Sequence, residues 1–282
     1  MHLRFSAHVP RRWGFRLLRA LVVAYAIVCA GCAAWQRHLI YFPQKFSPEQ
    51  MDAAGKSENL ERWKNTRGEN IGWCRPSPSQ PSLGRILLTH GNGECAFQDA
   101  HYADRIQEAL PMDVYILEYP GYADRPGKPT EKSIEAAAAD ALLSLPPDKP
   151  VVLVGSSLGT GVACWLAGQY PARISGVILL APFTSLVDVG RDRMPWLPVG
   201  WILVDRFNSV ENLKTYSGPL AVAVAGQDRV VPQKLGRKLF EGYHGPKRLW
   251  EFPDEDHGSV MLQPASTWKE FIGFVYPGNS QL

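Results

Sequence analysis

A serine set between two glycines is the residue of this sequence best placed for covalent chemistry. Gly155-Ser156-Ser157-Leu158-Gly159 directly follows an apolar run at residues 151–154 and opens a helical pattern. At a sharp strand-to-helix turn, small residues two positions before and after a serine leave room for its strained backbone, and its hydroxyl projects above the sheet edge. We predict that Ser157 is a nucleophile rather than an idle serine in a glycine-rich turn. Ser156 is the weaker candidate because it is not centred between the glycines.

A serine hydroxyl is a poor nucleophile at neutral pH and needs a base, usually an imidazole oriented by a carboxylate. When the serine stands at such a turn, the acid and then the histidine follow it in the chain. His244 and His257 are the histidines downstream of Ser157. His257 follows an apolar run at residues 249–252, so a loop can bring its ring to the carboxyl edge of a sheet. His244 precedes that run, and we therefore predict His257 as the base.

The acid that orients this histidine is predicted to be Asp228. It follows the apolar run at residues 220–225, again where a strand would end at the carboxyl edge of a sheet. Its carboxylate would hold His257 in the required tautomer and stabilise the imidazolium that forms. The rivals are two aspartates beside the histidine and three further upstream: Asp254, Asp256, Asp188, Asp192 and Asp205.

Acyl transfer also develops negative charge on a carbonyl oxygen, which requires preorganised donors. One predicted donor is the backbone N–H of Leu158, the residue after the nucleophile. The other is the N–H of Asn92, in the glycine-rich loop His90-Gly91-Asn92-Gly93. His90 precedes the nucleophile, and we interpret it as a brace for this loop. No P-loop, dinucleotide fingerprint or metal-ligand cluster competes with this set, so we predict neither a cofactor nor a metal.

The elements that must position these residues follow from alternating patterns. Short apolar runs alternate with helical patterns from about residue 84 onward, which is typical of βαβ units and a mostly parallel sheet. Strands are predicted at residues 85–89, 114–118, 151–154, 177–180, 220–225 and 249–252, with an antiparallel edge hairpin around 71–75. Helices are predicted at residues 101–110, 131–145, 158–169, 233–241 and 268–275. Together they indicate one α/β domain.

One interval interrupts this rhythm. Residues 182–217 contain no strand pattern but are rich in large apolar residues, among them Met194, Trp196 and Trp201. Two interpretations stay open: a surface helix that covers the sheet, and a small helical lid or acyl-binding wall, since such sites are concave and largely hydrophobic.

The N-terminus has the pattern of a targeting or anchoring segment. A basic stretch ends at Arg19, and the next eleven residues carry no charge. Extending this run through Trp35 gives sixteen residues, fewer than the roughly 20 of a comfortable membrane span. The sequence Ala30-Gly31-Cys32 resembles the end of a bacterial lipoprotein signal, in which Cys32 would be lipidated; an uncleaved anchor is the alternative. We predict a segment 1–32 and a catalytic domain 33–282, with the domain outside the cytoplasm on the cell envelope.

Charge and cysteine content exclude other classes. Five of the 30 basic residues lie in residues 1–31, and without them 25 basic residues stand against 27 acidic ones. No basic stripe for nucleic acid remains. The cysteines outside the N-terminal segment are Cys74, Cys95 and Cys164. Their number is odd, and Cys164 lies in an apolar helical pattern typical of core packing; a disulfide between two of them is left open.

Several motifs together resemble one known family. They are His90-Gly91-Asn92-Gly93, Glu118-Tyr119-Pro120-Gly121-Tyr122, Gly155-Ser156-Ser157-Leu158-Gly159, Ala181-Pro182-Phe183-Thr184-Ser185-Leu186, Gly226-Gln227-Asp228 and Asp256-His257-Gly258. In this order, and with Leu39-Ile40-Tyr41-Phe42-Pro43 ahead of them, they resemble the membrane-associated α/β-hydrolase-domain serine hydrolases, a group with eukaryotic members that remove palmitoyl groups from proteins. The resemblance implies the α/β-hydrolase fold, the triad Ser157, Asp228 and His257, and an ester or thioester substrate. After Tyr122 the sequence departs from the family, and we expect residues 123–127 to border the acyl or leaving-group side.

The leading hypothesis is a cell-envelope serine hydrolase that cleaves carboxylic esters or thioesters through an acyl-enzyme. A peptidase or amidase on the same triad is the first alternative. The second is a non-catalytic binding module on this scaffold, since fold does not fix function. The expected partners are an acylated or small-molecule substrate and, through the N-terminal segment, a membrane. Oligomeric state is left open.

Overall fold

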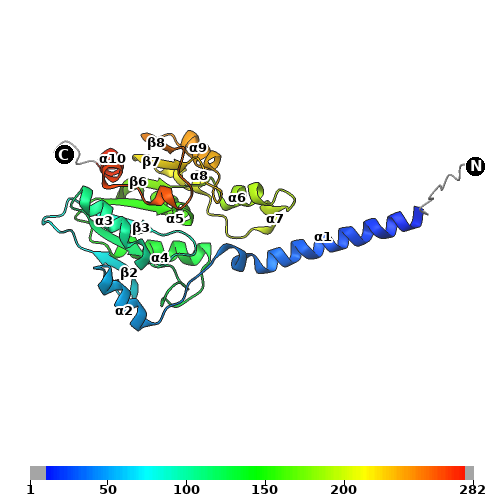
Figure 1. Cartoon of the computed structure of the whole chain (residues 1–282), viewed down its shortest axis with the longest axis horizontal. Coiled ribbons are helices and arrows are strands. Elements are labelled where there is room, and N and C mark those ends of the chain that lie inside the picture. Colours follow the sequence, from blue (N-terminus) through cyan, green and yellow to red (C-terminus); the bar gives the residue numbers. More distant parts are fainter. Residues whose placement is uncertain (1–10, 277–282) are drawn as a thin grey trace, which may run out of the picture.

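A computed structural model describes residues 11–276 of the 282-residue chain. A two-sided α/β body carries a single long helix, α1 (Arg11–Ile40), which projects from it like a stalk (Figure 1). The body contains the nucleophile turn and its predicted partners, and the stalk joins it beside the helices that follow β6.

A twisted sheet forms the centre of the body. Its order is β1-β2-β4-β3-β5-β6-β7-β8. Six strands run parallel: β3 (Arg85–Thr89), β4 (Asp113–Leu117), β5 (Val151–Ser156), β6 (Ile174–Leu180), β7 (Leu220–Ala225) and β8 (Lys247–Phe252). At one edge β1 (Glu61–Lys64) and β2 (Asn70–Arg75) add antiparallel pairs. Every residue of β3, β5 and β7 is buried, as expected for strands covered on both faces.

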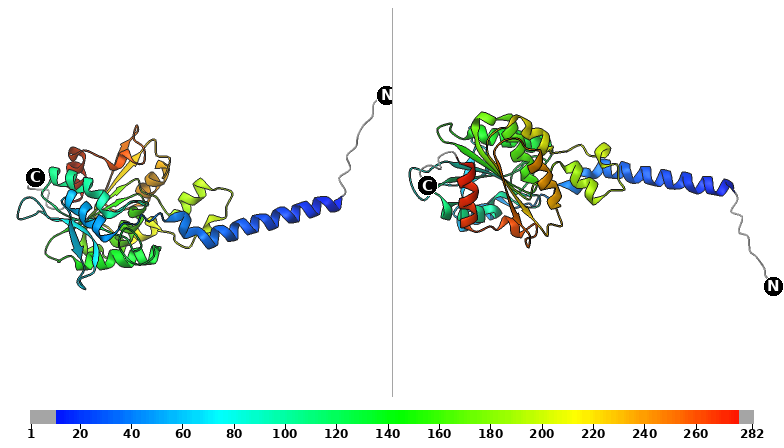
Figure 2. Two further views of the ribbon diagram at one scale, coloured as in Figure 1. Left: turned by 60° about the horizontal axis from the view of Figure 1, so that its bottom comes forward. Right: turned by 90° about the horizontal axis from the view of Figure 1, so that it is seen from above.

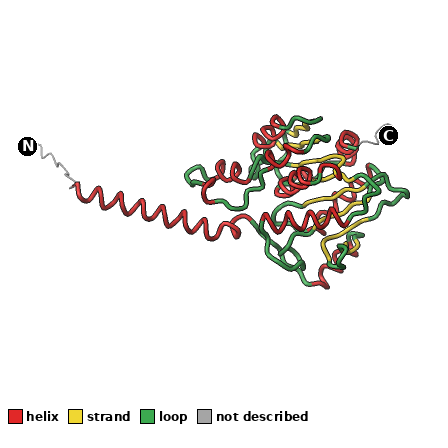
Figure 3. Tube along the Cα trace, turned by 180° about the vertical axis from the view of Figure 1, so that it is seen from behind, coloured by secondary structure: helices red, strands yellow, loops and turns green. Residues whose placement is uncertain are grey.

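Helices cover both faces of the sheet (Figures 2 and 3). One core cluster packs α4 (Glu131–Ser144), α5 (Leu158–Gln169) and α9 (Gln233–Gly242) against the sheet. The other packs α2 (Pro48–Ser57), α3 (Ala100–Ala109) and α10 (Ala265–Val275). Short 3₁₀ turns occur at Ala96–Asp99, Pro171–Arg173, Leu213–Thr215 and Ser259–Met261. The expected mostly parallel sheet flanked by helices is confirmed.

Local chemistry explains where these elements begin and end. The Thr130 hydroxyl accepts a hydrogen bond from the Ser133 N–H at 3.0 Å and caps α4; such a cap contributes about 1 kcal/mol. The helix ends at Ser144, ahead of Pro146 and Pro147, which cannot continue it. The predicted bounds of α5 and β7 agree with the structure residue for residue. α2 and β1 were not predicted, since neither has a clear apolar period.

The interval 182–217 is a small helical insertion, as predicted, and we call it the lid. It contains α6 (Leu186–Arg193), α7 (Val199–Ile202) and α8 (Ser209–Asn212). Both views of Figure 2 place its α6–α7 part against the body end of α1. Between the two predicted roles, the wall interpretation fits this placement, because these residues extend beyond the sheet instead of covering it.

α1 is one continuous helix that extends past the apolar run seen in the sequence. A stretch of 29 residues, Arg12–Ile40, has a mean hydropathy of 2.1 over its most apolar window and meets the length and composition of a membrane span, as a signal sequence also does. At 1.5 Å per residue the whole helix is about 45 Å long. Residue 32, where the sequence predicts the N-terminal segment to end, lies inside this helix; that boundary stays a prediction.

Hydrogen bonds fix the lid to α1. The Gln36 side chain donates to the Ile202 carbonyl at 3.2 Å and accepts from the Val204 N–H at 2.7 Å. At the base of the lid, Asp205 accepts from Arg37 Nε at 3.1 Å and from the Tyr41 hydroxyl at 3.0 Å. The Asp205 carboxylate is buried, whereas the Arg37 side chain that pairs with it is 51% exposed. The helix is therefore part of the tertiary structure at its body end.

The lid segment between α7 and α8 is held by Glu131, the first residue of α4. Glu131 accepts hydrogen bonds from the N–H groups of Arg206 and Phe207, at 2.7 and 2.5 Å. One turn further along α4, burial together with the charges of Glu131 and Asp205 raises the pKa of Glu135 from 4.5 to about 7. Its charged form is disfavoured in the folded state, so ionised Glu135 costs stability above that pKa.

Replacing Glu135 by Gln is therefore expected to stabilise the protein above pH 4.5, with the full effect at neutral and alkaline pH. The unfavourable contribution is fully present above pH 7 and disappears as the pH falls toward 4.5. We expect Glu135→Gln to raise the Tm of the full chain in detergent by roughly 2–4 °C at pH 8.5 and to leave it unchanged at pH 4.5. Glu108→Gln, at an exposed helix position, is the control. An equal shift at both pH values would contradict the assignment.

Candidate active site

The turn between β5 and α5 holds Ser157 in a strained conformation. Its φ and ψ are 49° and −116°, and its N–H donates to the Leu180 carbonyl at 3.0 Å. A positive φ costs a non-glycine residue of order 1–3 kcal/mol, which the surrounding packing must supply. The conformation places the serine side chain on the wall of a cavity at the carboxyl edge of the sheet.

The two glycines of the motif are required by close backbone contacts. A Cβ on Gly159 would lie 1.9 Å from the Thr89 carbonyl oxygen, and one on Gly155 would lie 2.7 Å from the Gly159 oxygen. Thr89 also donates from its hydroxyl to the Gly159 carbonyl at 2.9 Å. The first turn of α5 thus crosses the end of β3 at a distance that side chains would forbid.

The three residues predicted as a triad lie within hydrogen-bonding distance of one another. His257 Nε2 is 3.0 Å from Ser157 Oγ, and His257 Nδ1 is 2.7 Å from Asp228 Oδ2. An ionised carboxylate can only accept, so Nδ1 carries the hydrogen and Nε2 is left to accept the serine proton. The second oxygen of Asp228 accepts from the N–H groups of Val230 and Val231, both at 2.7 Å.

These positions come from three separate strand ends, as the sequence predicts. Ser157 follows β5, Asp228 follows β7 and His257 follows β8. The Asp228 side chain is 1% exposed, whereas that of His257 is 21% exposed, so the acid is buried and the imidazole ring is partly accessible. The rival Asp256 instead accepts from the N–H groups of Gly258 and Ser259 and shapes the histidine loop.

The predicted oxyanion donors lie on the same cavity as Ser157. Leu158 and Asn92 both line it, and the Leu158 N–H is the first of α5, where no preceding helical carbonyl is available. The Asn92 side chain is fixed to the segment after α1: its amide donates to the Ile40 carbonyl and its oxygen accepts from the Phe42 N–H at 3.1 Å. The Tyr122 hydroxyl donates to the same oxygen at 2.7 Å.

His90 is fully buried beneath this loop. Its ring packs against Tyr119 with centroids 3.9 Å apart, and its Nε2 lies 3.2 Å from Glu118. The Tyr119 hydroxyl donates to the His90 carbonyl at 2.8 Å. The ring therefore braces the loop and does not approach Ser157, in agreement with the sequence interpretation.

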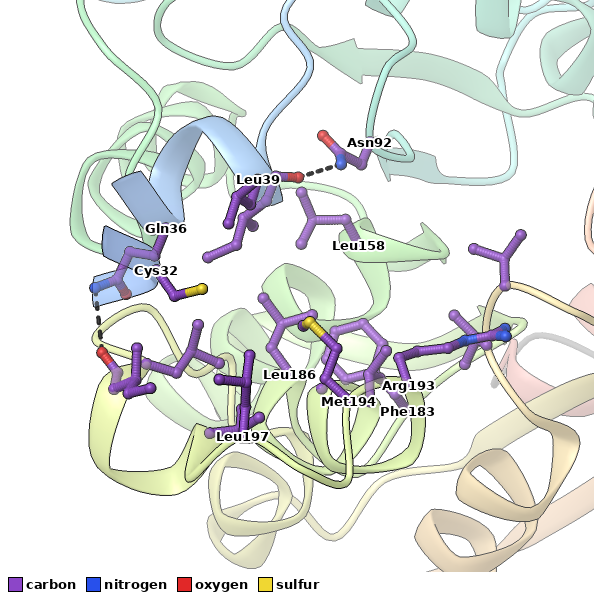
Figure 4. A pocket seen from close by; sticks show the side chains of 18 of the residues that line it. Cys32, Gln36, Leu39, Asn92, Leu158, Phe183, Leu186, Arg193, Met194 and Leu197 are labelled. Carbon is purple, nitrogen blue, oxygen red and sulfur yellow. Dashed lines mark hydrogen bonds between the residues drawn. The ribbon is translucent and has the colours of Figure 1, made fainter. Parts of the chain in front are cut away.

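A cavity of about 310 Å³ with a mainly apolar wall lies over Ser157 (Figure 4). One side is formed by α1 and the residues after it, with Cys32, Gln36 and Leu39 pointing into it. The lid forms the opposite side, where Leu186, Met194 and Leu197 are prominent. The remaining lid residues on the wall are Phe183, Val189, Gly190, Arg193, Val199, Ile202 and Leu203.

Sequence reasoning missed the contribution of α1 to this cavity. It treated residues 1–32 as a separate segment, although Cys32 and Gln36 line the wall beside Ser157. The available signal was Gln36, a polar residue at the end of an otherwise apolar run, together with the family-like stretch 39–43.

One expectation about the cavity border was wrong. Residues 123–127 do not line it. Asp124 pairs with Arg62 at 2.8 Å, and the Arg125 guanidinium donates to the Glu118 carbonyl. Both side chains are held by charged or polar partners near the antiparallel edge of the sheet, so the departure from the family affects that edge instead of the acyl side.

Within residues 11–276 no group of three or more His, Cys, Asp or Glu side chains is arranged to hold a metal ion. The cysteines Cys74, Cys95 and Cys164 are unpaired in the structure, and Cys164 is buried in the core as predicted.

Comparison with known proteins identifies the family. A family model described as alpha/beta hydrolase fold matches residues 84–213. A protein of Mycobacterium tuberculosis (strain ATCC 25618 / H37Rv), named Uncharacterized protein Rv2307c, is 32% identical over 254 residues, which are 86% of this chain and 89% of that protein. The chain belongs to the α/β-hydrolase superfamily. As a member of this superfamily it is a hydrolase.

Other members of the superfamily share either part of the sequence or the fold. Mouse lysophosphatidylserine lipase ABHD12 is 30% identical over 200 residues, covering 63% of this chain and 50% of that protein. Among solved structures, the Pyrococcus furiosus esterase PF2001 has a TM-score of 0.60 at 14% identity, covering 83% of this chain and 96% of the esterase. Est1E from Butyrivibrio proteoclasticus, solved with ferulic acid, has a TM-score of 0.56 at 16% identity, covering 71% and 92%. At this level of sequence identity, the similarity to these two structures establishes the fold alone.

The crossing of α5 over β3 gives a direct test of the turn. Gly159→Ala is expected to destabilise the protein by about 3 kcal/mol or more, because the new methyl group meets a backbone carbonyl that cannot move away. Chemical unfolding of the purified full chain measures this. Gly242→Ala is the matched control, since a Cβ there meets nothing within 4 Å. Equal stability of the two variants would refute the close-contact argument.

Proposed function

We propose that this protein is a serine hydrolase that cleaves carboxylic esters or thioesters through an acyl-enzyme. The observation that carries the proposal is His257, whose two ring nitrogens lie 3.0 Å from Ser157 Oγ and 2.7 Å from Asp228 Oδ2. A nucleophile and base in hydrogen-bonding reach, with the base oriented by a third group, form the general arrangement for activating a hydroxyl.

In the proposed first step Ser157 Oγ attacks the carbonyl carbon of the substrate while His257 Nε2 takes the hydroxyl proton. The electron pair of the carbonyl moves to its oxygen, where the N–H groups of Asn92 and Leu158 stabilise the negative charge. Collapse of this tetrahedral species breaks the bond to the alcohol or thiol, which receives the proton from His257. The acyl group remains on Ser157 as an ester.

In the second step a water molecule takes the place of the alcohol. His257 removes its proton as the water oxygen attacks the acyl carbon, and the same donors hold the oxyanion. Collapse releases the carboxylic acid and returns the proton to Ser157. Asp228 stabilises the imidazolium in both steps, and the N–H groups of Val230 and Val231, which donate to its other carboxylate oxygen, hold the carboxylate in position.

The cavity supports an acyl group as the part of the substrate that is recognised. Its wall is mainly apolar, and lid and α1 side chains form its two sides. Such a wall favours an alkyl chain by burial of apolar area, at roughly 0.8 kcal/mol for each CH₂. The lipase and esterase names of the relatives are in line with this substrate class.

We also propose that α1 remains attached and anchors the protein in a membrane, with the body outside the cytoplasm on the cell envelope. Basic residues at the start of the helix, Arg12, Arg16 and Arg19, favour retention of that end on the cytoplasmic side. Retention is supported by the Tyr25 hydroxyl, which lies ahead of the predicted cleavage point and donates to the Trp196 carbonyl at 2.7 Å.

Replacing Ser157 by Ala should abolish turnover. We expect the rate of p-nitrophenyl butyrate hydrolysis to fall by roughly 10⁴–10⁶-fold and labelling by a fluorophosphonate probe to disappear. The matched control is Ser156→Ala, because this neighbouring serine is buried in β5 and does not line the cavity. Unchanged activity of Ser157→Ala at normal folding would refute the proposal.

The intact mass of the protein shows whether the N-terminal helix is retained or removed by cleavage before Cys32. We expect protein extracted from membranes to retain the helix, with the mass of the 31.3 kDa chain. A shorter species that begins at a lipidated Cys32 would instead support the lipoprotein prediction. Cys32→Ser serves as the control. If the helix is retained, this variant is also found as the full-length chain; if the protein is a lipoprotein, the variant loses the shorter lipidated species.

A further inference from the structure

Two charge-free segments lie side by side at the stalk end of the molecule. In α1, residues 20–36 carry no charge, and in the lid the same is true of residues 194–204, between Arg193 and Asp205. Figures 1 and 2 place α7 along the body end of α1, and the Tyr25–Trp196 and Gln36–Ile202 hydrogen bonds fix two points of contact.

The outer side chains of this lid segment are large, apolar and exposed. Trp201 is 94% exposed, Val204 63% and Trp196 58%. Among the described residues beyond the lid and α1, few large apolar side chains have comparable exposure: Phe42 and Val230, which line the cavity, and Leu143 and Leu262, which do not. A contiguous exposed apolar surface marks an interaction site, and exposed tryptophans are typical of a membrane boundary.

Several backbone polar groups of the lid segment are paired within the protein, as a lipid environment requires. Non-helical backbone is tolerated at membrane depth where its N–H and C=O groups are paired within the protein. Gln36 pairs with the Ile202 carbonyl and the Val204 N–H, and Tyr25 pairs with the Trp196 carbonyl. Polar side chains of α1 therefore form hydrogen bonds with lid backbone groups that α7 does not pair by itself.

The depth of this arrangement matches one leaflet. Tyr25 and Gln36 are eleven residues apart on a continuous helix, a rise of about 17 Å, or roughly half of the ~30 Å hydrocarbon core of a bilayer. The pair Arg37–Asp205 lies just beyond Gln36, where the apolar segments of both elements end. This ion pair therefore marks the level at which the polar boundary of the membrane would begin.

We propose that the lid segment 194–204 inserts into the outer leaflet beside α1, and that an acyl chain of a membrane lipid enters between them to reach Ser157. The cavity lies between the two elements, with Cys32 and Leu39 on one side and Met194 and Leu197 on the other. The Asn92 amide donates to the Ile40 carbonyl, which lies just past the Arg37–Asp205 pair on α1. The proposed oxyanion donor is therefore at the level of the polar boundary, so the ester group would be bound there while its acyl chain stays in the leaflet.

The substrate class is therefore a lipid acyl ester presented by a bilayer. This part rests on the proposed esterase function, whereas insertion of the lid does not. The occupant is a bilayer because the exposed surface is continuous with a helix that itself has the length and composition of a membrane span.

Tryptophan quenching tests insertion independently of catalysis. The full chain is reconstituted in phosphatidylcholine vesicles whose acyl chains carry bromine, which quenches nearby tryptophans. The loss of fluorescence caused by bromine is measured for the unsubstituted protein and for each Trp→Phe variant. The difference between the two losses is the contribution of the replaced tryptophan. The contribution of Trp201 should be quenched strongly. Trp250→Phe is the control, since Trp250 lies on β8 and donates to Glu270 on the body surface. Equal quenching of the two residues, or none at Trp201, would overturn the proposal.

The catalytic consequence is measured as a ratio of two activities: hydrolysis of p-nitrophenyl palmitate embedded in vesicles, and hydrolysis of p-nitrophenyl acetate in detergent. Trp201→Asp should lower this ratio roughly tenfold, because a carboxylate in the leaflet is costly. Trp201 does not line the cavity. Leu143→Asp, at an exposed apolar position of α4, is the matched control and should keep the ratio unchanged.

The outcomes separate the two proposals. If neither ester is hydrolysed by the unsubstituted protein, the esterase proposal fails, and quenching still decides whether the lid inserts. If both esters are hydrolysed but Trp201→Asp and Leu143→Asp give the same ratio, lipid entry beside the lid is refuted while the esterase proposal stands.

Discussion

The close crossing of α5 over the end of β3 is the constraint on which the candidate site depends. At Gly159 the helix backbone approaches the Thr89 carbonyl so closely that only hydrogen fits, and the strain at Ser157 is the local consequence of that approach. Because β3 also leads into the loop with Asn92, one contact sets the position of Ser157, the predicted nucleophile, relative to both predicted oxyanion donors. The strain is maintained by the largely buried strands β3 and β6 on each side of β5.

Around this rigid centre, the parts that shape the cavity come from outside the sheet. The lid is inserted between β6 and β7, and α1 precedes all strands, yet they meet over Ser157. Their contact relies on a few specific polar pairs, with Gln36 and Asp205 at the centre. Members of the superfamily share the sheet, so differences in substrate are expected to arise where this chain joins an N-terminal helix to its lid.

Much of the fold and of the candidate site follows from local signals in the sequence. α5 and β7 were predicted to the residue, because continuous apolar runs are bounded there by glycine, proline or the nucleophile turn. Ser157, Asp228 and His257 could be chosen because each follows a recognisable strand. The contact between α1 and the lid could not be predicted, since it depends on groups far apart in the sequence. The Gln36 side chain, for example, accepts from the Val204 N–H 168 positions away, and such a pairing produces no periodic pattern. Residues 123–127 were misplaced for the same reason: their partners lie on a distant edge strand.

The bond between Asn92 and the end of α1 has a practical consequence for protein engineering. The Asn92 side chain is hydrogen-bonded to Ile40 and Phe42, and Asn92 also lines the cavity, so this residue connects the end of α1 to the site in the body. The two are therefore not interchangeable modules. A soluble fragment that begins after this junction would fold around the same sheet but lack one wall of its cavity and the tether of its loop. Chimeras are better joined ahead of Tyr25, where the helix has not yet met the rest of the molecule.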